Sequence, residues 1–143
     1  MSQVFHHARR VEFRDTDMAG IVHFSVFFTY MEEAEHAFLR STGLGVFMDH
    51  DNRKISWPRV AADCNYRSAI RFEDDLDIQV SIQRLGTKSI TFCHQMFLDD
   101  RKVADGQITT VCCEMVPHAK PESIEIPRFV IDALKPYQQI QPE

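Results

Sequence analysis

Two carboxylates and a histidine lie close together in the stretch DTDMAGIVHF, which runs from Asp15 to Phe24. A carboxylate can act as a general base toward water or as a nucleophile toward an acyl carbon, and a histidine can transfer protons near neutral pH. Ile21 and Val22 in the same stretch are poorly suited to a solvated surface connection. We therefore expect the stretch to be anchored in the core and to hold its polar side chains in fixed positions.

One long helix is predicted directly after this stretch, from Ser25 to about Thr42. Ser25 is a suitable N-cap residue, and Gly43 stands where a helix commonly ends. Apolar residues recur at three- and four-residue spacing and form one stripe: Phe27, Tyr30, Met31, Ala34 and Phe38. The first N–H groups of such a helix have no intrahelical acceptors, so they could polarise the carbonyl group of a substrate.

The remaining segments mostly show the two-residue alternation of strands. The predicted strands cover residues 4–14, with clear alternation from Val11 to Arg14, and residues 60–67, 76–83, 89–98 and 103–116. A polar stretch from Asp49 to Lys54 precedes most of them, and Pro127 to Lys135 could form a short final helix. Short connections favour antiparallel neighbours, so the prediction is an α+β fold with the long helix on one face of about five strands. The uncovered strands are long enough to pair with another subunit.

The composition predicts one soluble cytoplasmic domain over residues 1–143. The formal net charge of −5 disfavours binding to nucleic acid or to an anionic membrane surface. The N-terminus lacks the apolar region of a signal peptide, and no apolar stretch approaches the ~20 residues that span a bilayer. The four cysteines form no C-x-x-C pair, and we expect them to be reduced thiols packed as small hydrophobic groups.

The sequence resembles the 4-hydroxybenzoyl-CoA thioesterase family of hotdog-fold proteins. The resemblance is carried by a strand that ends in V-E-F, the D-T-D-M-A-G-I-V-H-F stretch, the aromatic-rich helix that follows, and the order of the later strands. It implies a curved antiparallel sheet wrapped around one long central helix. It also implies a homodimer or homotetramer that hydrolyses an acyl-CoA substrate without a metal or a cofactor.

The resemblance implies roles for particular residues. The second acid of the motif, Asp17, would be the base or the nucleophile, and the backbone N–H of Phe24 would stabilise the oxyanion. Lys88 and Ser89 match a position that contacts CoA, beside a turn at Gly86. On this basis the substrate site consists of Asp17 and Phe24 as catalytic residues, with binding residues Gly20, His23, Phe27, Lys88 and Ser89.

The residue types themselves refine these roles. Gly20 lacks a Cβ, so it suits a strained backbone or a close backbone approach. Asp15 is explained by stabilisation of a turn or by exposure to solvent. Many bacterial relatives carry Tyr-His where this chain has His23-Phe24, so we assign His23 to the lining of the pocket and not to catalysis.

Other functions remain open from the sequence. A hotdog dehydratase would pair His23 with Glu32 or Glu33 on the helix, and these two acids are also reserve candidates for thioester hydrolysis. A non-catalytic acyl-CoA-binding protein is a further alternative. Glu33 and His36 form one E-x-x-H pair, but a carboxylate-bridged metal site needs a second pair, which the sequence lacks. The acyl group, aryl or short to medium aliphatic, is not determined.

Overall fold

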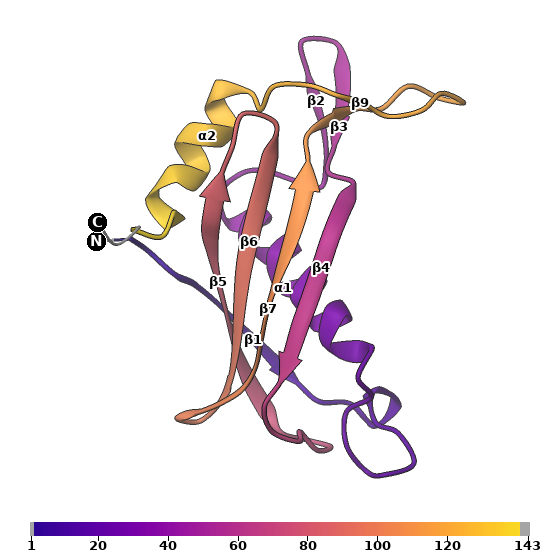
Figure 1. Cartoon of the computed structure of the whole chain (residues 1–143), viewed down its shortest axis with the longest axis vertical. Coiled ribbons are helices and arrows are strands. Elements are labelled where there is room, and N and C mark those ends of the chain that lie inside the picture. Colours follow the sequence, from indigo (N-terminus) through magenta and orange to yellow (C-terminus); the bar gives the residue numbers. More distant parts are fainter. Residues whose placement is uncertain (1, 141–143) are drawn as a thin grey trace.

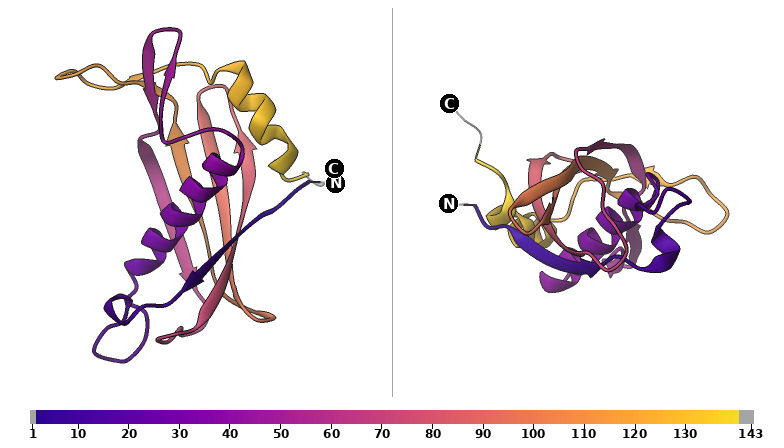
Figure 2. Two further views of the ribbon diagram at one scale, coloured as in Figure 1. Left: turned by 180° about the vertical axis from the view of Figure 1, so that it is seen from behind. Right: turned by 90° about the horizontal axis from the view of Figure 1, so that it is seen from below.

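The computed structural model describes residues 2–140, in which a curved five-stranded sheet lies around one helix (Figures 1 and 2). The strand order is β1-β5-β6-β7-β4, and every neighbouring pair is antiparallel. The strands are β1 (Phe5–Arg10), β2 (Phe47–His50), β3 (Arg53–Ser56), β4 (Arg59–Tyr66), β5 (Asp75–Leu85), β6 (Ser89–Leu98), β7 (Arg101–Val111), β8 (Cys113–Glu114) and β9 (Glu122–Ser123). The helices are α1 (Val26–Ser41) and α2 (Arg128–Leu134), with 3-10 turns η1 (Phe13–Asp15) and η2 (Lys135–Tyr137). The predicted α+β class, the main sheet and the short final helix are confirmed.

Helix α1 packs its predicted apolar stripe against the concave face of the sheet. The side chains of the stripe are at most 4% exposed: Phe27, Tyr30, Met31, Ala34 and Phe38. The helix ends as expected, because Gly43 adopts a left-handed φ of 82° and the Leu44 N–H donates to the Leu39 carbonyl group at 2.9 Å. The interior of this face therefore forms one continuous hydrophobic core.

The helix is shorter than the long central helix that the resemblance implies. Its 16 residues extend over about 24 Å, whereas the 11 residues of β5 extend over about 36 Å. α1 consequently covers only part of the length of the sheet. Helix α2 packs near the end of the sheet that lies opposite the start of α1, and its residues Val130 and Leu134 are fully buried (Figure 1).

A second, small sheet with the order β2-β3-β8-β9 was not predicted. The stretch from Asp49 to Lys54, expected to be merely polar, forms most of the β2–β3 hairpin. Asp51 and Asn52 at its tip both have positive φ angles, 49° and 62°, as a two-residue type I′ turn requires. The sequence therefore contained residues suited to this turn, Asp51 and Asn52, but the polar character of the stretch did not indicate two strands.

The first strand ends four residues earlier than predicted. β1 stops at Arg10, and the alternation from Val11 to Arg14 is not a strand, because residues 13–15 turn into η1. The Asp15 carboxylate accepts the Glu12 N–H at 2.9 Å and closes this turn. Val11 is nevertheless fully buried beside Asp74, whose carbonyl oxygen accepts its N–H.

Strand β4 lies at an edge of the main sheet and is exposed along nearly its whole length. The predicted alternation of buried and exposed residues is wrong here, since among its eight residues only Cys64 is partly buried. Val60 and Tyr66 are 61% and 47% exposed. An edge strand with free backbone groups and exposed apolar side chains can pair with another chain.

The four cysteines are free thiols, as expected. Cys112 lies between β7 and β8 and Cys113 begins β8, and both side chains are buried. No helix within residues 2–140 combines the length and the apolar character needed to cross a lipid bilayer.

Gly106 of β7 is required by close packing between the sheet and α1. A Cβ atom at this position would lie 2.2 Å from the Asp63 carbonyl oxygen on β4 and 2.6 Å from the Met31 methyl group. We expect Gly106→Ala to lower the free energy of unfolding by about 3 kcal/mol, measured by urea denaturation. Gly45→Ala is the matched control, because its Cβ would meet nothing closer than 3.7 Å. Equal stability of the two variants would contradict this packing.

His94 of β6 is fully buried, with its ring beside the backbone of Met31 and Gly106. Burial, with a smaller effect from the charge of Arg59, lowers the pKa of His94 from its ordinary 6.5 to about 3. Between pH 6.5 and about 3, His94 is protonated in the unfolded chain but neutral in the folded chain. The free energy of unfolding therefore falls as the pH falls through this range.

We expect His94→Gln to reduce the acid sensitivity of the fold. Between pH 6.5 and about 4, the unfolding free energy of both proteins should fall as the pH is lowered. The slope for the wild type should exceed that for the variant by about 1.4 kcal/mol per pH unit. Urea unfolding at several pH values measures these slopes. His6→Gln, which changes an exposed histidine, should keep the wild-type slope. Parallel profiles of wild type and His94→Gln would rule out His94 as the source of the acid sensitivity.

Candidate active site

The stretch that carries Asp17 forms a small closed loop at the end of the sheet where β5 begins (Figure 1). The two arms of the loop are joined by the His23 N–H donating to the Asp15 carbonyl group at 2.9 Å, by a bridge between Thr16 and Val22, and by the Asp17 N–H donating to the Ile21 carbonyl group at 2.8 Å. We call residues 15–23 the acid loop. Because both arms are paired, the position of Asp17 is coupled to the start of α1.

The acid loop is anchored in the core, as its apolar residues predict. Val22 is 4% exposed, and its N–H donates to the carbonyl group of Ile70 at 2.8 Å. Gly20 has a left-handed φ of 80°, which confirms the need for a strained backbone. The expected close backbone approach at Gly20 is wrong, because nothing lies within 4 Å of a Cβ built there.

Asp17 is partly buried and is oriented by its own loop. Its Oδ1 accepts the N–H of Ala19 at 2.8 Å, as in an Asx turn. The other oxygen, Oδ2, has no hydrogen-bond partner among the described residues. The carboxylate is therefore held at one oxygen and available at the other.

The Phe24 N–H lies between the acid loop and α1 and makes no hydrogen bond to any residue within 2–140. The carbonyl group of the same residue accepts the Tyr66 hydroxyl at 2.9 Å, which fixes the orientation of this peptide segment from β4. The Phe24 side chain is 65% exposed. A fixed and unused donor at a helix N-terminus can stabilise negative charge on a nearby oxygen.

A cavity of about 390 Å³ brings Asp17 and Phe24 together. Phe27 forms part of its wall and meets the Tyr66 ring edge-on, with centroids 4.9 Å apart. The other lining residues are Ile21, Val22, Arg67, Ser68, Ala69 and Ile70. A carboxylate, an unused N–H and aromatic walls in one cavity can bind an apolar acyl group and act on its carbonyl carbon. Tyr66 and residues 68–70 were not predicted as site residues, because only the fold brings them beside the acid loop.

His23 does not line this cavity. Its Nδ1 lies 2.8 Å from the Ser25 hydroxyl and accepts the Ser25 N–H at 3.3 Å, and its ring stacks on Phe24 with centroids 4.6 Å apart. The His23 ring thus contacts the Phe24 side chain but is not part of the cavity lining. The structure does not bring it together with Glu32 or Glu33, which pair with Arg59 and Arg9 instead.

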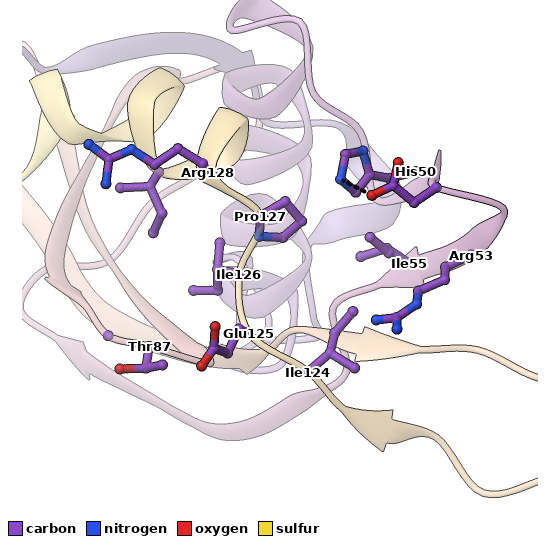
Figure 3. A pocket seen from close by; sticks show the side chains of 12 residues that line it. His50, Arg53, Ile55, Thr87, Ile124, Glu125, Ile126, Pro127 and Arg128 are labelled. Atoms are coloured by element: carbon purple, nitrogen blue, oxygen red, sulfur yellow. Dashed lines mark ion pairs between the residues drawn. The ribbon is translucent and has the colours of Figure 1, made fainter.

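Lys88, in the turn between β5 and β6, and Ser89, the first residue of β6, lie at the opposite end of the sheet from Asp17 (Figure 1). Residues of this turn border a second cavity of about 730 Å³, enclosed by the β2–β3 hairpin and the start of α2. Figure 3 shows Arg53, Arg128 and the His50–Asp51 ion pair around it, above an apolar floor. The length of β5, about 36 Å, separates this turn from the acid loop.

Two further acids are buried, and the sequence did not identify either as buried. Asp15 is 6% exposed, accepts two hydrogen bonds and forms an ion pair with Arg9, so turn stabilisation is confirmed and solvent exposure is wrong. Glu35 of α1 is 1% exposed and accepts Arg59 at 2.6 Å, whereas its Oε1 has no partner among the described residues. Burial raises the pKa of Glu35, although Arg59 beside it acts in the opposite direction. Neither acid lines the Asp17 cavity.

Comparisons with known proteins identify the family of this chain. Residues 11–134 match the family described as the thioesterase-like superfamily. A protein of Aquifex aeolicus (strain VF5), provisionally named an esterase, is 34% identical over 131 residues, covering 92% of this chain and 98% of that protein. The 1,4-dihydroxy-2-naphthoyl-CoA hydrolase of Trichodesmium erythraeum (strain IMS101) is 28% identical over 96 residues, covering 67% of this chain and 70% of that enzyme.

A solved structure extends the comparison to three dimensions. The gentisyl-coenzyme A thioesterase BH1999 has a TM-score of 0.77 to this chain at 31% identity, covering 92% of this chain and 99% of that chain. Residues 11–134, which match the superfamily, contain the whole acid loop, helix α1 and the strands of the main sheet from β4 to β7.

Proposed function

Since the chain belongs to the thioesterase-like superfamily and is a thioester hydrolase, we propose that it hydrolyses an aryl-CoA thioester in the Asp17 cavity. The observation that carries the proposal is that Asp17 and Phe24, whose N–H is unused among the described residues, both line one aromatic-walled cavity. Hydrolysis of a thioester needs both an activated oxygen nucleophile and a donor for the oxygen that becomes negative.

The Asp17 carboxylate supplies the first requirement in either of two ways. As a base, Oδ2 removes a proton from water while that water attacks the thioester carbon. As a nucleophile, Oδ2 attacks the carbon itself, the CoA thiolate leaves, and water then hydrolyses the resulting anhydride. The hydrogen bond from the Ala19 N–H to Oδ1 orients the carboxylate in both cases.

The Phe24 N–H supplies the second requirement. It stands at the N-terminus of α1, where the helix dipole also favours negative charge. A single positioned donor of this kind contributes about 3 kcal/mol to the transition state. Tyr66 maintains the geometry, because its hydroxyl holds the carbonyl group of the same residue.

The aromatic walls support an aryl substrate. Phe27 and Tyr66 are arranged edge to face, and the volume of about 390 Å³ suits one or two fused rings. The relatives are named for 1,4-dihydroxy-2-naphthoyl-CoA and gentisyl-CoA, both of which carry aromatic acyl groups. The similarity to the 4-hydroxybenzoyl-CoA thioesterase family therefore holds at the level of the superfamily, and these names favour other hydroxyaryl substrates within it.

The first test is the substitution Asp17→Asn, which removes the charge and keeps the shape. We expect it to reduce turnover of a panel of aryl-CoA esters by about 10³-fold or more, because the residue acts on the reacting atoms. Release of the free CoA thiol measures the rate. Asp132→Asn, the same chemical change on exposed α2, is the control and should leave turnover unchanged.

Two outcomes would contradict this mechanism. Full activity in Asp17→Asn would exclude the carboxylate as base or nucleophile. Tight binding of the aryl-CoA panel by wild type without thiol release would instead indicate a binding protein. Faster turnover of medium aliphatic acyl-CoA esters would contradict the aryl preference alone.

A complete substrate site needs a second copy of the chain. Lys88 can hold a CoA phosphate, but the distance along β5 is too great for one CoA molecule to reach both Lys88 and the Asp17 cavity of the same chain. Antiparallel pairing of two exposed β4 strands would place opposite ends of the two sheets next to each other. We therefore propose a homodimer in which Lys88 and Ser89 of one copy serve the Asp17 cavity of the other.

Mixed dimers test this arrangement. Lys88→Ala alone should lower kcat/KM by about tenfold through loss of a charged contact. Dimers of one Lys88→Ala chain and one Asp17→Asn chain, isolated with two different tags, should contain one intact site and regain about half of the wild-type kcat/KM. Mixed dimers of Asp17→Asn with Lys120→Ala, an exposed loop lysine, provide the control. If the kcat/KM of the mixed dimer does not exceed the mean of the values for the two homodimeric variants, Lys88 and Asp17 act within the same chain.

A further inference from the structure

Asp15 lies two residues before Asp17 and has contacts that no surface turn would need. Its carboxylate is almost fully buried, and one oxygen, Oδ2, accepts two hydrogen bonds and forms one ion pair, each from a different segment. The Tyr30 hydroxyl of α1 donates to it at 2.7 Å, the Glu12 N–H donates at 2.9 Å, and the Arg9 guanidinium of β1 lies 3.4 Å away. A charged group is buried in this way only where surrounding groups compensate its loss of hydration.

The donors are themselves fixed. The Arg9 guanidinium lies over the Tyr30 ring, 4.8 Å from its centroid, and its Nε donates to Glu33 at 3.1 Å. Burial, together with the hydrogen bond to Asp15, raises the pKa of Tyr30, so the hydroxyl keeps its proton and remains a donor. Asp15 is consequently attached to β1 and to the first turns of α1 at the same time.

The backbone of Asp15 connects this anchor to the reactive groups. Its carbonyl oxygen accepts the His23 N–H at 2.9 Å, and His23 directly precedes Phe24. One residue thus holds the two ends of the acid loop, with Asp17 following on one side and the Phe24 N–H on the other. A displacement of Asp15 would change the separation between carboxylate and oxyanion donor.

We propose that Asp15 is a positioning residue, whose buried carboxylate sets the distance between the Asp17 carboxylate and the Phe24 N–H. This inference rests on the proposed function of those two groups. Asp15 does not line the cavity and does not touch the substrate, so it acts through the geometry of the acid loop. Misplacement of reacting groups by about 1 Å reduces rates by about 100-fold, which sets the expected size of the effect.

The test compares Asp15→Asn, Tyr30→Phe, Asp17→Asn and the double variant Asp15→Asn/Asp17→Asn. Single-turnover rates with an aryl-CoA ester at high enzyme concentration make the residual activities measurable. We expect Asp15→Asn to lower kcat by about 100-fold with KM unchanged. Tyr30→Phe, which removes one of the two hydrogen bonds to Asp15 and keeps the ring under Arg9, should lower kcat less and also leave KM unchanged.

The double variant separates positioning from general stability. If Asp15 acts through Asp17, adding Asp15→Asn to Asp17→Asn should cause no further loss. An equal additional loss, or wild-type kcat in Asp15→Asn, would overturn the inference. Asp75→Asn, which breaks the exposed ion pair with Arg10 at the same end of the sheet, is the matched control and should keep wild-type kcat.

The outcomes also distinguish this inference from the proposed function. Full activity in Asp17→Asn would overturn the proposed function whatever Asp15 does. Should Asp15→Asn fail to fold, as judged by circular dichroism, Tyr30→Phe decides the question. A fall in its kcat at constant KM supports positioning by Asp15, and an unchanged kcat overturns it.

Discussion

The packing of α1 on the concave face of the sheet is the constraint on which the rest of the structure depends. The helix is shorter than the longest strands, so it could lie at several positions along them. Its packing selects one position, and with it the location of the helix N-terminus. The apolar stripe from Phe27 to Phe38 determines that point, and the absence of a side chain at Gly106 lets Met31 approach β7. The acid loop is the segment that connects this fixed helix start to β1.

Charged groups attach the helix to both edges of the sheet. Arg9 of β1 pairs with Glu33 and Asp15, and Arg59 of β4 pairs with Glu35 and Glu32. Buried pairs of this kind contribute less to stability than to a single defined arrangement, because desolvation offsets much of their attraction. In this protein the arrangement that they define is the location of the helix N-terminus relative to the two edge strands.

Asp17 differs from these acids in a way that suits chemistry. Asp15 and Glu35 are buried and are held by the Tyr30 hydroxyl and by the Arg59 guanidinium group, whereas Asp17 is only partly buried, accepts one backbone N–H and lies beside a cavity. A carboxylate that is fully paired is stabilised in its ground state and is a poor base or nucleophile. Rigid support by the buried Asp15 and reactivity in the accessible Asp17 are therefore divided between neighbouring positions of the same loop.

Local periodicity in the sequence determined α1, β5, β6 and the fold class, because those patterns repeat every 3.6 or two residues and need no knowledge of distant partners. The D-T-D-M-A-G-I-V stretch likewise indicated Asp17 as the candidate reagent. Only the tertiary structure decided which acids are buried, since Asp15 meets Tyr30 and Glu35 meets Arg59, residues 15 and 24 positions away in the chain. It also decided that β4 is exposed on both faces and that Lys88 lies at the far end from Asp17. Burial and distance depend on which segments pack together, and a pattern read along one chain segment contains no information about its neighbours in space.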